Sequence, residues 1–338
     1  MLTNRSTRTR GKESAPVISN VGRLGVPRHG RVRSSCVRDI VETMWTSRHP
    51  HPSGHALACR IYECANWDDF QQLIAHLSQP TVNAVFGATQ TVYRGQSDFR
   101  WPLQSLWERR FHHIQRAGLG EIYSVQRSEA DERYHSVLRW QLSSFKARAT
   151  HVDLTLAEMH DDQWWGLGRH HGLWTPLLDW TYDAYIAAYL ALAGHRGTHT
   201  DIPVAVWAFP LADYLKDGSD LAWGKWTHPT FSRRQQAQKG LFTRLSSPVF
   251  TDLENYLRNA DYRFTSSPYP LMARIDIASS VAETALADLT TKGINDRTLL
   301  LTEGIDRQLD QLDIIARQCN AELSAARGVP STVHTGAL

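Results

Sequence analysis

Residues 168–181 carry more hydrogen-bonding side chains than a core segment needs. The stretch reads Gly-Arg-His-His-Gly-Leu-Trp-Thr-Pro-Leu-Leu-Asp-Trp-Thr. Histidine exchanges protons near neutral pH, and a tryptophan ring can stack on a ligand. Residues 184–193 follow with the apolar spacing of a buried helix. The sequence therefore predicts a polar site directly in front of this helix.

A second chemical element is Tyr-Arg-Gly-Gln at residues 93–96. The Arg94 guanidinium offers a forked pair of donors to a phosphate or a carboxylate. The glycine after it allows a ligand to approach the backbone, and the glutamine adds a neutral donor and acceptor. The competing interpretation is that Arg94 only braces a carboxylate such as Asp98 or Asp179.

The adjacent histidines His170 and His171 can diverge because Gly172 permits a sharp turn. No histidine or cysteine lies four residues from either one, so we expect no metal site. One histidine is a candidate general acid or base, and the other is a candidate packed residue. Asp179 is placed to pair with Arg94 or to orient a histidine.

Two further elements have competing interpretations. Thr181 is a candidate ligand contact or the cap of the helix that follows it. Gln238 precedes Lys239, Gly240 and an aromatic strand, and it is a candidate site residue. The neighbouring Arg233, Arg234 and Lys239 are interpreted as a solvated basic face.

The elements that must position these residues are helices interspersed with short strands. Helical spacing covers residues 67–77, with Asn66 as N-cap, and also 121–146, 154–165, 280–292 and 309–326. Short strands are expected at 91–95, 177–178, 204–209, 240–243 and 271–277, with Pro210 ending the third. Regular alternation of strand and helix is absent. The predicted fold class is therefore α+β, with a short-stranded mixed sheet flanked by helices.

Composition separates the N-terminal region from the remainder of the chain. Residues 1–50 hold ten basic residues against three acidic ones, whereas the whole chain of 338 residues has a net charge of +3. We expect residues 1–50 to form a flexible basic arm, either a solvated tail or a segment attracted to nucleic acid. No apolar run reaches membrane-spanning length, and four scattered cysteines are typical of a reduced, cytoplasmic protein.

The two motifs resemble those of the FRG domain family, which is named for a Phe/Tyr-Arg-Gly motif. The likeness extends over roughly residues 60–315 and includes Trp-Pro-Leu-Gln-Ser-Leu at 101–106. Residues 316–338 would then form a C-terminal helix and tail. Trp174 and Gln104 stand where the family usually has proline. Pro176 stands where it usually has arginine, which removes one cation near the predicted site.

The same motifs are similar, more weakly, to those of ADP-ribosyltransferases. That resemblance implies three strands around NAD, which begin near Tyr93, Leu178 and Gln238. It departs at Gly240, which stands where those enzymes have a catalytic glutamate that stabilises an oxocarbenium-like centre. The implied catalytic residues are Arg94, His171, Asp179 and Gln238. The implied NAD-contacting residues are Tyr93, Arg94, Gly95, Gln96, His170, Thr175, Trp180 and Thr181.

Three functions follow as hypotheses. The first is a divergent ADP-ribosyltransferase that uses NAD as co-substrate to modify a nucleic acid or a protein, as a toxin (with an antitoxin partner) or a phage-defence effector. The second is a non-catalytic module that recognises a nucleotide or a nucleic acid. The third is a hydrolase in which His170 or His171 works with Asp179, although no nucleophile motif such as GxSxG accompanies it.

Overall fold

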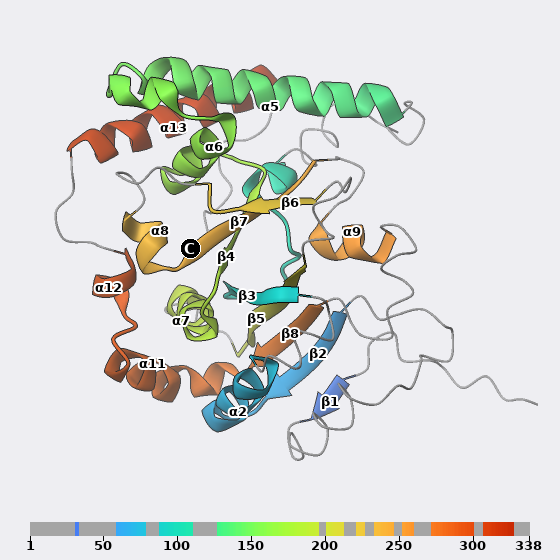
Figure 1. Ribbon diagram of the computed structural model, residues 1–338. Coiled ribbons are helices and arrows are strands. Elements are labelled where there is room, and N and C mark those ends of the chain that lie inside the picture. Colours follow the sequence, from blue (N-terminus) through green and yellow to red (C-terminus); the bar gives the residue numbers. More distant parts are fainter. Residues whose placement is uncertain are drawn as a thin grey trace, which may run out of the picture.

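An eight-stranded mixed sheet organises the part of the chain that the computed structural model describes. The described residues are 31–33, 59–78, 88–110, 127–195, 201–212, 221–226, 233–246, 252–259, 272–300 and 307–327. The strand order is β1-β2-β8-β5-β3-β4-β7-β6, with the first two pairings parallel and the others antiparallel (Figure 1). The strands are β1 Arg31–Arg33, β2 Cys59–Cys64, β3 Ala88–Gln96, β4 Leu177–Thr181, β5 Val204–Ala212, β6 Leu221–Gly224, β7 Gly240–Leu245 and β8 Met272–Ile277.

Helices pack on both faces of this sheet, so the predicted α+β class is confirmed (Figure 1). They are α2 Trp67–Leu77, α5 Arg127–Ala149, α6 Asp161–His170, α7 Ala184–His195, α8 Arg233–Ala237, α9 Leu253–Asn259, α11 Ala282–Thr291, α12 Asp296–Leu300 and α13 Arg307–Arg327, with short 3-10 turns at Leu154–Glu158 and Ser279–Val281. The α2 prediction is confirmed in detail, because Asn66 Oδ1 accepts a hydrogen bond from Asp69 N and caps the helix.

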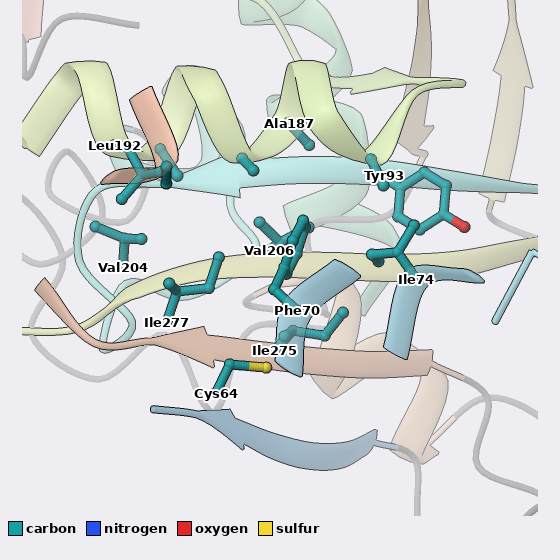
Figure 2. Close-up of a cluster of buried hydrophobic side chains, with 14 of the residues drawn as sticks. Cys64, Phe70, Ile74, Tyr93, Ala187, Leu192, Val204, Val206, Ile275 and Ile277 are labelled. Carbon is teal, nitrogen blue, oxygen red and sulfur yellow. The ribbon is translucent and has the colours of Figure 1, made fainter. Parts of the chain in front are cut away.

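One face of the sheet is covered by α7, α2 and α11. Their apolar side chains meet those of β2, β3, β5 and β8 in what we call the first core (Figure 2). Helix α7 approaches β3 closely at Gly95, where an added Cβ would lie 2.0 Å from the carbonyl oxygen of Ala187. Gly95 is therefore required for helix packing, not for the approach of a ligand as the sequence had suggested.

Two further cores complete the described structure. The second core joins α5, α6 and α13 to Leu177 of β4 and Phe242 of β7. The third core lies on the opposite face of the sheet, under α9, and includes Leu178 and Trp180 of β4. Side chains alternate along a strand, so Asp179 lies on the face of Leu177, away from Trp180. Its registered neighbour Phe242 belongs to the second core, whereas the Thr181–Tyr93 pair borders the first. Asp179 thus sits on the seam between the two cores.

Three predicted boundaries need correction. Strand β5 continues through Pro210 to Ala212, because its ladder with β8 ends at Ala208 and the missing proline N–H removes no bond there. The helix predicted at 154–165 is a 3-10 turn followed by α6, since Met159 and His160 are extended. Helix α13 crosses the boundary predicted between residues 315 and 316.

Of the basic arm predicted at residues 1–50, the structure describes only residues 31–33. Arg31–Arg33 form β1, which pairs with β2, so this piece is not the unstructured chain that the composition predicted. The other residues of the arm lie outside the described residues.

Candidate anion site

Asp179 is the centre of the candidate site. Its carboxylate accepts a forked contact from Arg169, whose Nε and Nη2 lie 2.9 and 2.6 Å from Oδ2. Arg169 belongs to the last turn of α6, and its side chain is only 5 % exposed, whereas that of Asp179 is 31 % exposed. Helix α6 therefore holds a buried guanidinium against the seam, and one side of the carboxylate remains open to solvent.

Arg94 reaches the same carboxylate from β3. Strands β3 and β4 share one registered pair, Tyr93 with Thr181, and Arg94 Nη1 donates to the backbone oxygen of Asp179 at 2.8 Å next to it. The same nitrogen lies 3.5 Å from Asp179 Oδ2. The guanidinium thus replaces a backbone bond and supports the carboxylate. The expected Arg94–Asp179 proximity is confirmed, whereas anion binding by Arg94 stays a prediction.

Two more arginines extend this group, which we call the arginine cluster: Arg94, Arg109, Arg169 and Arg234. Arg109 and Arg234 act on Asp179 and Arg169 through charge without a direct bond. A capping box positions Arg109, since Ser105 N donates to Glu108 Oε2 and Glu108 N donates to Ser105 Oγ. Arg234 lies on α8. Within the described residues, neither Arg109 nor Arg234 forms an ion pair.

The charge states of the site follow from burial and from these neighbours. Burial alone would raise the pKa of Asp179, but Arg169 and Arg94 outweigh it and lower that pKa to about 2. Burial lowers the pKa of Arg94 to about 10, with Asp179 opposing the shift and Arg169 adding to it. At neutral pH the cluster therefore carries four positive charges, and the carboxylates that act on them in the described part of the chain are those of Asp179 and, near Arg234, Asp313.

His170 borders the cluster. Its Nε2 lies 3.1 Å from Gln235 Oε1, and Gln235 Nε2 in turn donates to the backbone oxygen of Gly240 at 3.4 Å. Burial lowers the pKa of His170 to about 4, although its bond to Gln235 opposes the shift. His170 is consequently neutral at pH 7. Gly240 is packed under Gln235, since an added Cβ would lie 2.7 Å from Gln235 Cγ.

His171 takes a different direction from its neighbour. Gly172 adopts φ +82, which confirms the predicted sharp turn, and it follows the end of α6 at His170, five residues beyond the predicted helix end at residue 165. His171 Nδ1 lies 2.6 Å from Asp313 Oδ1 on α13. Asn320 of the same helix donates to the backbone oxygen of Gly172 at 2.8 Å. The hydrolase hypothesis in its His171–Asp179 form loses its geometric basis, because the partner carboxylate of His171 is Asp313.

Several other predicted site residues make structural contacts. Gln238 Nε2 donates to the backbone oxygen of Leu299, and Gln96 bonds Pro102 O and Trp207 Nε1. Tyr93 is buried in the first core, with its hydroxyl 3.2 Å from Ser78 Oγ. The expectation that Arg94, His171, Asp179 and Gln238 meet in one cleft is therefore met only by Arg94 and Asp179.

The remaining predicted residues lie around β4. Trp180 faces the third core and donates to Thr243 Oγ1. Thr181 Oγ1 accepts a hydrogen bond from Asp183 N. The side chain that accepts from the first N–H groups of α7 is that of Asp183, so the helix cap lies two residues after the predicted Thr181. Thr175 is fully buried, and its Oγ1 makes no hydrogen bond. Neither the Trp180 bond nor the Thr181 bond involves the Asp179 carboxylate.

Sequence reasoning missed three of the residues that matter most here. The motifs do not single out Arg169, although it directly precedes the two histidines. The sequence pattern favours a solvated basic side chain for Arg234, and no motif includes Arg109. The Ser105-Leu-Trp-Glu108 capping box was a readable signal for the turn that carries Arg109. No comparable local signal marks Arg169, because its partner Asp179 belongs to the next strand.

The arrangement is suited to holding an anion. Guanidinium groups bind phosphate and carboxylate through short, charge-assisted hydrogen bonds, and two of the four here are already fixed by Asp179. In the described residues, no group of three or more His, Cys, Asp or Glu side chains could hold a metal ion. None of the described helices has the length and apolar character needed to cross a membrane.

Comparison with known proteins gives one family. Residues 89–199 match the family model of the FRG domain, which covers β3, α5, α6, β4 and α7 and includes Arg94, Arg109, Arg169 and Asp179. Arg234 lies outside the matched residues. No curated protein and no solved structure matches the chain. The match is narrower than the span of residues 60–315 that the motifs had indicated. By this match, which includes the Tyr-Arg-Gly motif that begins the site, residues 89–199 form an FRG domain.

Proposed function

We propose that the FRG domain of this chain is a recognition module that binds a phosphate group of a nucleotide or a nucleic acid at the arginine cluster. The single observation that carries the proposal is the excess of positive charge within the described residues, where four guanidinium groups are opposed by Asp179 and, near Arg234, by Asp313. Buried charges are normally paired one to one because an unpaired buried charge is costly. An anion from outside would complete the pairing here.

The position of each arginine supports a binding role. Arg94 and Arg169 are almost completely buried and are held in place by Asp179. A preorganised guanidinium loses little conformational entropy when it binds a ligand. Arg234 is half-buried and Arg109 is exposed, so both have room to turn toward an anion. The basic N-terminal arm would add salt-dependent affinity if the ligand is a nucleic acid.

A divergent ADP-ribosyltransferase is the second candidate, and one observation favours it. The three strands that the resemblance implies, β3, β4 and β7, are neighbours in the sheet. Two observations weigh against catalysis. Gly240 provides no carboxylate, and Asp179 is already neutralised by Arg94 and Arg169, so it is a weak stabiliser of an oxocarbenium-like centre.

Calorimetry separates the two candidates. We expect ATP, NAD or a short RNA to bind the full chain without nicotinamide release or label transfer. The double variant Arg109→Gln/Arg234→Gln removes two charges that form no ion pair among the described residues, so the fold should survive. Loss of two charge-assisted contacts should weaken binding by about 10-fold or more. Arg148→Gln, which removes an arginine paired with Glu322 outside the site, is the matched control.

The outcomes are distinct. Equal affinity of the double variant and the Arg148→Gln control would refute an anion site at the cluster. Nicotinamide release that depends on Arg94 would favour the transferase, and toxicity on expression that is lost in Arg94→Ala would support a toxin role for it.

A further inference from the structure

The charge balance of the site indicates how much negative charge its ligand brings. The arginine cluster has four positive charges, and Asp179 contributes one negative charge. Asp313, which acts on Arg234 from α13, contributes at most one more. His170 contributes none, because its pKa is about 4. Two to three positive charges therefore remain uncompensated within the described residues.

The depth of the arginines limits the shape of the group that can reach them. Arg94 and Arg169 are 7 % and 6 % exposed, and both contact Asp179. Arg94 Nε is buried and makes no hydrogen bond. Arg234 and Arg109 are progressively more exposed, so they form the outer part of the cluster. Asp179, which both buried arginines contact, has a side chain that is 31 % exposed.

A phosphodiester fits this arrangement poorly. It has a single negative charge and two bulky substituents, so one of them would have to enter the seam. A terminal phosphate is bound through one oxygen, leaves three oxygens free for guanidinium contacts and carries close to two negative charges at neutral pH. The charge excess and the depth of the site thus point to the same kind of group.

We propose that the arginine cluster recognises a terminal phosphate, the end of a nucleotide or of a nucleic-acid strand, and discriminates against internal phosphodiesters. This inference rests on the proposed function, since it specifies the group that the same site binds. The buried Arg94 and Arg169 take the free phosphate oxygens, and Arg109 and Arg234 neutralise the second negative charge.

The test uses ligands that differ at this one group. Calorimetry with the full chain compares adenosine 5′-monophosphate with the dinucleoside monophosphate ApA, which has the same base and one internal diester. We expect the monophosphate to bind at least about 10-fold more tightly, because it carries a second negative charge and makes one additional charge-assisted contact. A second pair, hexauridylate with and without a 5′-phosphate, identifies the source: tight binding of the phosphorylated hexamer assigns a strand end.

Each result has a separate meaning. ApA binding as tightly as the monophosphate, together with equal binding of both hexamers, would overturn the preference for a terminal phosphate and leave the proposed function standing. Failure of all phosphorylated ligands to bind would overturn both. In Arg109→Gln/Arg234→Gln the advantage of the monophosphate over ApA should shrink toward one, whereas Arg148→Gln should keep it. Retention of the full advantage in the double variant would contradict the assigned role of the outer arginines.

Discussion

Two arginine–aspartate arrangements in this sheet differ in their charge balance. On β8, Arg274 and Asp276 form a forked pair with two contacts of 2.8 Å, and the guanidinium stacks on the rings of Phe99 and Trp207. One arginine faces one aspartate in that pair. On β4, Asp179 contacts two members of the arginine cluster, Arg94 and Arg169, and the charges of the other two also act on it. Asp313 is a second carboxylate near Arg234.

The comparison distinguishes structural charge from functional charge. A balanced, buried pair satisfies its own charges and needs nothing from outside. A cluster with more positive than negative charges is stable only because part of it remains solvated. It can bind an anion where it is exposed to water. Both aspartates accept forked arginine contacts, but Asp179 is more exposed than Asp276, and more guanidinium groups lie around it.

The largest expected effect is on stability, when each aspartate is neutralised. Asp276→Asn leaves Arg274 buried without its partner and should cost about 3–5 kcal/mol of unfolding free energy. Asp179→Asn should cost less, about 2–3 kcal/mol, because Asp179 is partly exposed and its loss can be compensated by an anion. Urea unfolding at pH 7 measures both values.

Inorganic phosphate sharpens this comparison. Its addition at constant ionic strength should raise the unfolding midpoint of Asp179→Asn more than that of the unmodified chain, and should leave Asp276→Asn nearly unchanged. Similar rescue of both variants would mean that the phosphate acts generally and that the cluster has no special role.

The next effect tests what holds the cluster in place. Asn320 is buried and accepts from Trp174 N and Gln141 Nε2 while donating to Gly172 O, so it fixes the turn between Arg169 and Asp179. Asn320→Ala should cost about 2–3 kcal/mol of stability and also reduce phosphate affinity. Glu322→Ala removes a surface contact of the same helix and should cost under about 1 kcal/mol. If ligand affinity is unchanged in a folded Asn320→Ala protein, helix α13 does not position the site.

Glu108 adds a third buried carboxylate, one without a bonded arginine. Burial raises its pKa to about 8, opposed by its bonds to Ser105, whereas Asp179 with its arginines is shifted in the other direction. A raised carboxyl pKa means that stability falls as pH increases from about 4.5 toward 8. Glu108→Gln should therefore stabilise the chain at pH 8 and have little effect at pH 5. Melting temperatures at the two pH values measure the difference, and equal shifts would place an ionised carboxylate at Glu108.

The smallest effect concerns His170 beside the cluster. Its pKa is lowered from 6.5 to about 4, mainly by burial, so the folded state resists protonation. Stability should fall as pH decreases from about 6.5 toward 4, because the unfolded chain takes up the proton first. His170→Gln should lose less stability than the unmodified chain between pH 7 and pH 5. An identical loss in both proteins would show that His170 titrates as it does in an unfolded chain.

Local sequence patterns predicted the helices, strands and turns better than the contacts between them. The apolar spacing of α2 and α7 and the turn at Gly172 were readable because each depends on neighbouring residues. The meeting of Arg94 with Asp179 was also foreseen, from the two motifs. The continuation of β5 through Pro210 was not predicted. It depends on where the pairing of β5 with the distant strand β8 ends, and that end, at Ala208, leaves no bond to β8 that the missing N–H of the proline could remove.

The site was predicted in part for the same reason. Arg169 and Arg234 belong to the site because they interact with Asp179. The partner of His171 is Asp313 on α13, more than a hundred residues away in the sequence. A polar residue in a motif can equally support the fold, as Gln96 and Gln238 do. Only the packing of α6 and α8 around β4 decides which of these residues share one site.

The most direct measurement is a crystal of the full chain soaked in tungstate, with the heavy anion located by anomalous scattering. The account predicts a tungstate bound by the guanidinium groups of the arginine cluster on the open side of Asp179, and none at Arg274 and Asp276. Tungstate bound elsewhere, with the arginine cluster empty in well-ordered density, would contradict the claim that the excess positive charge forms an anion site.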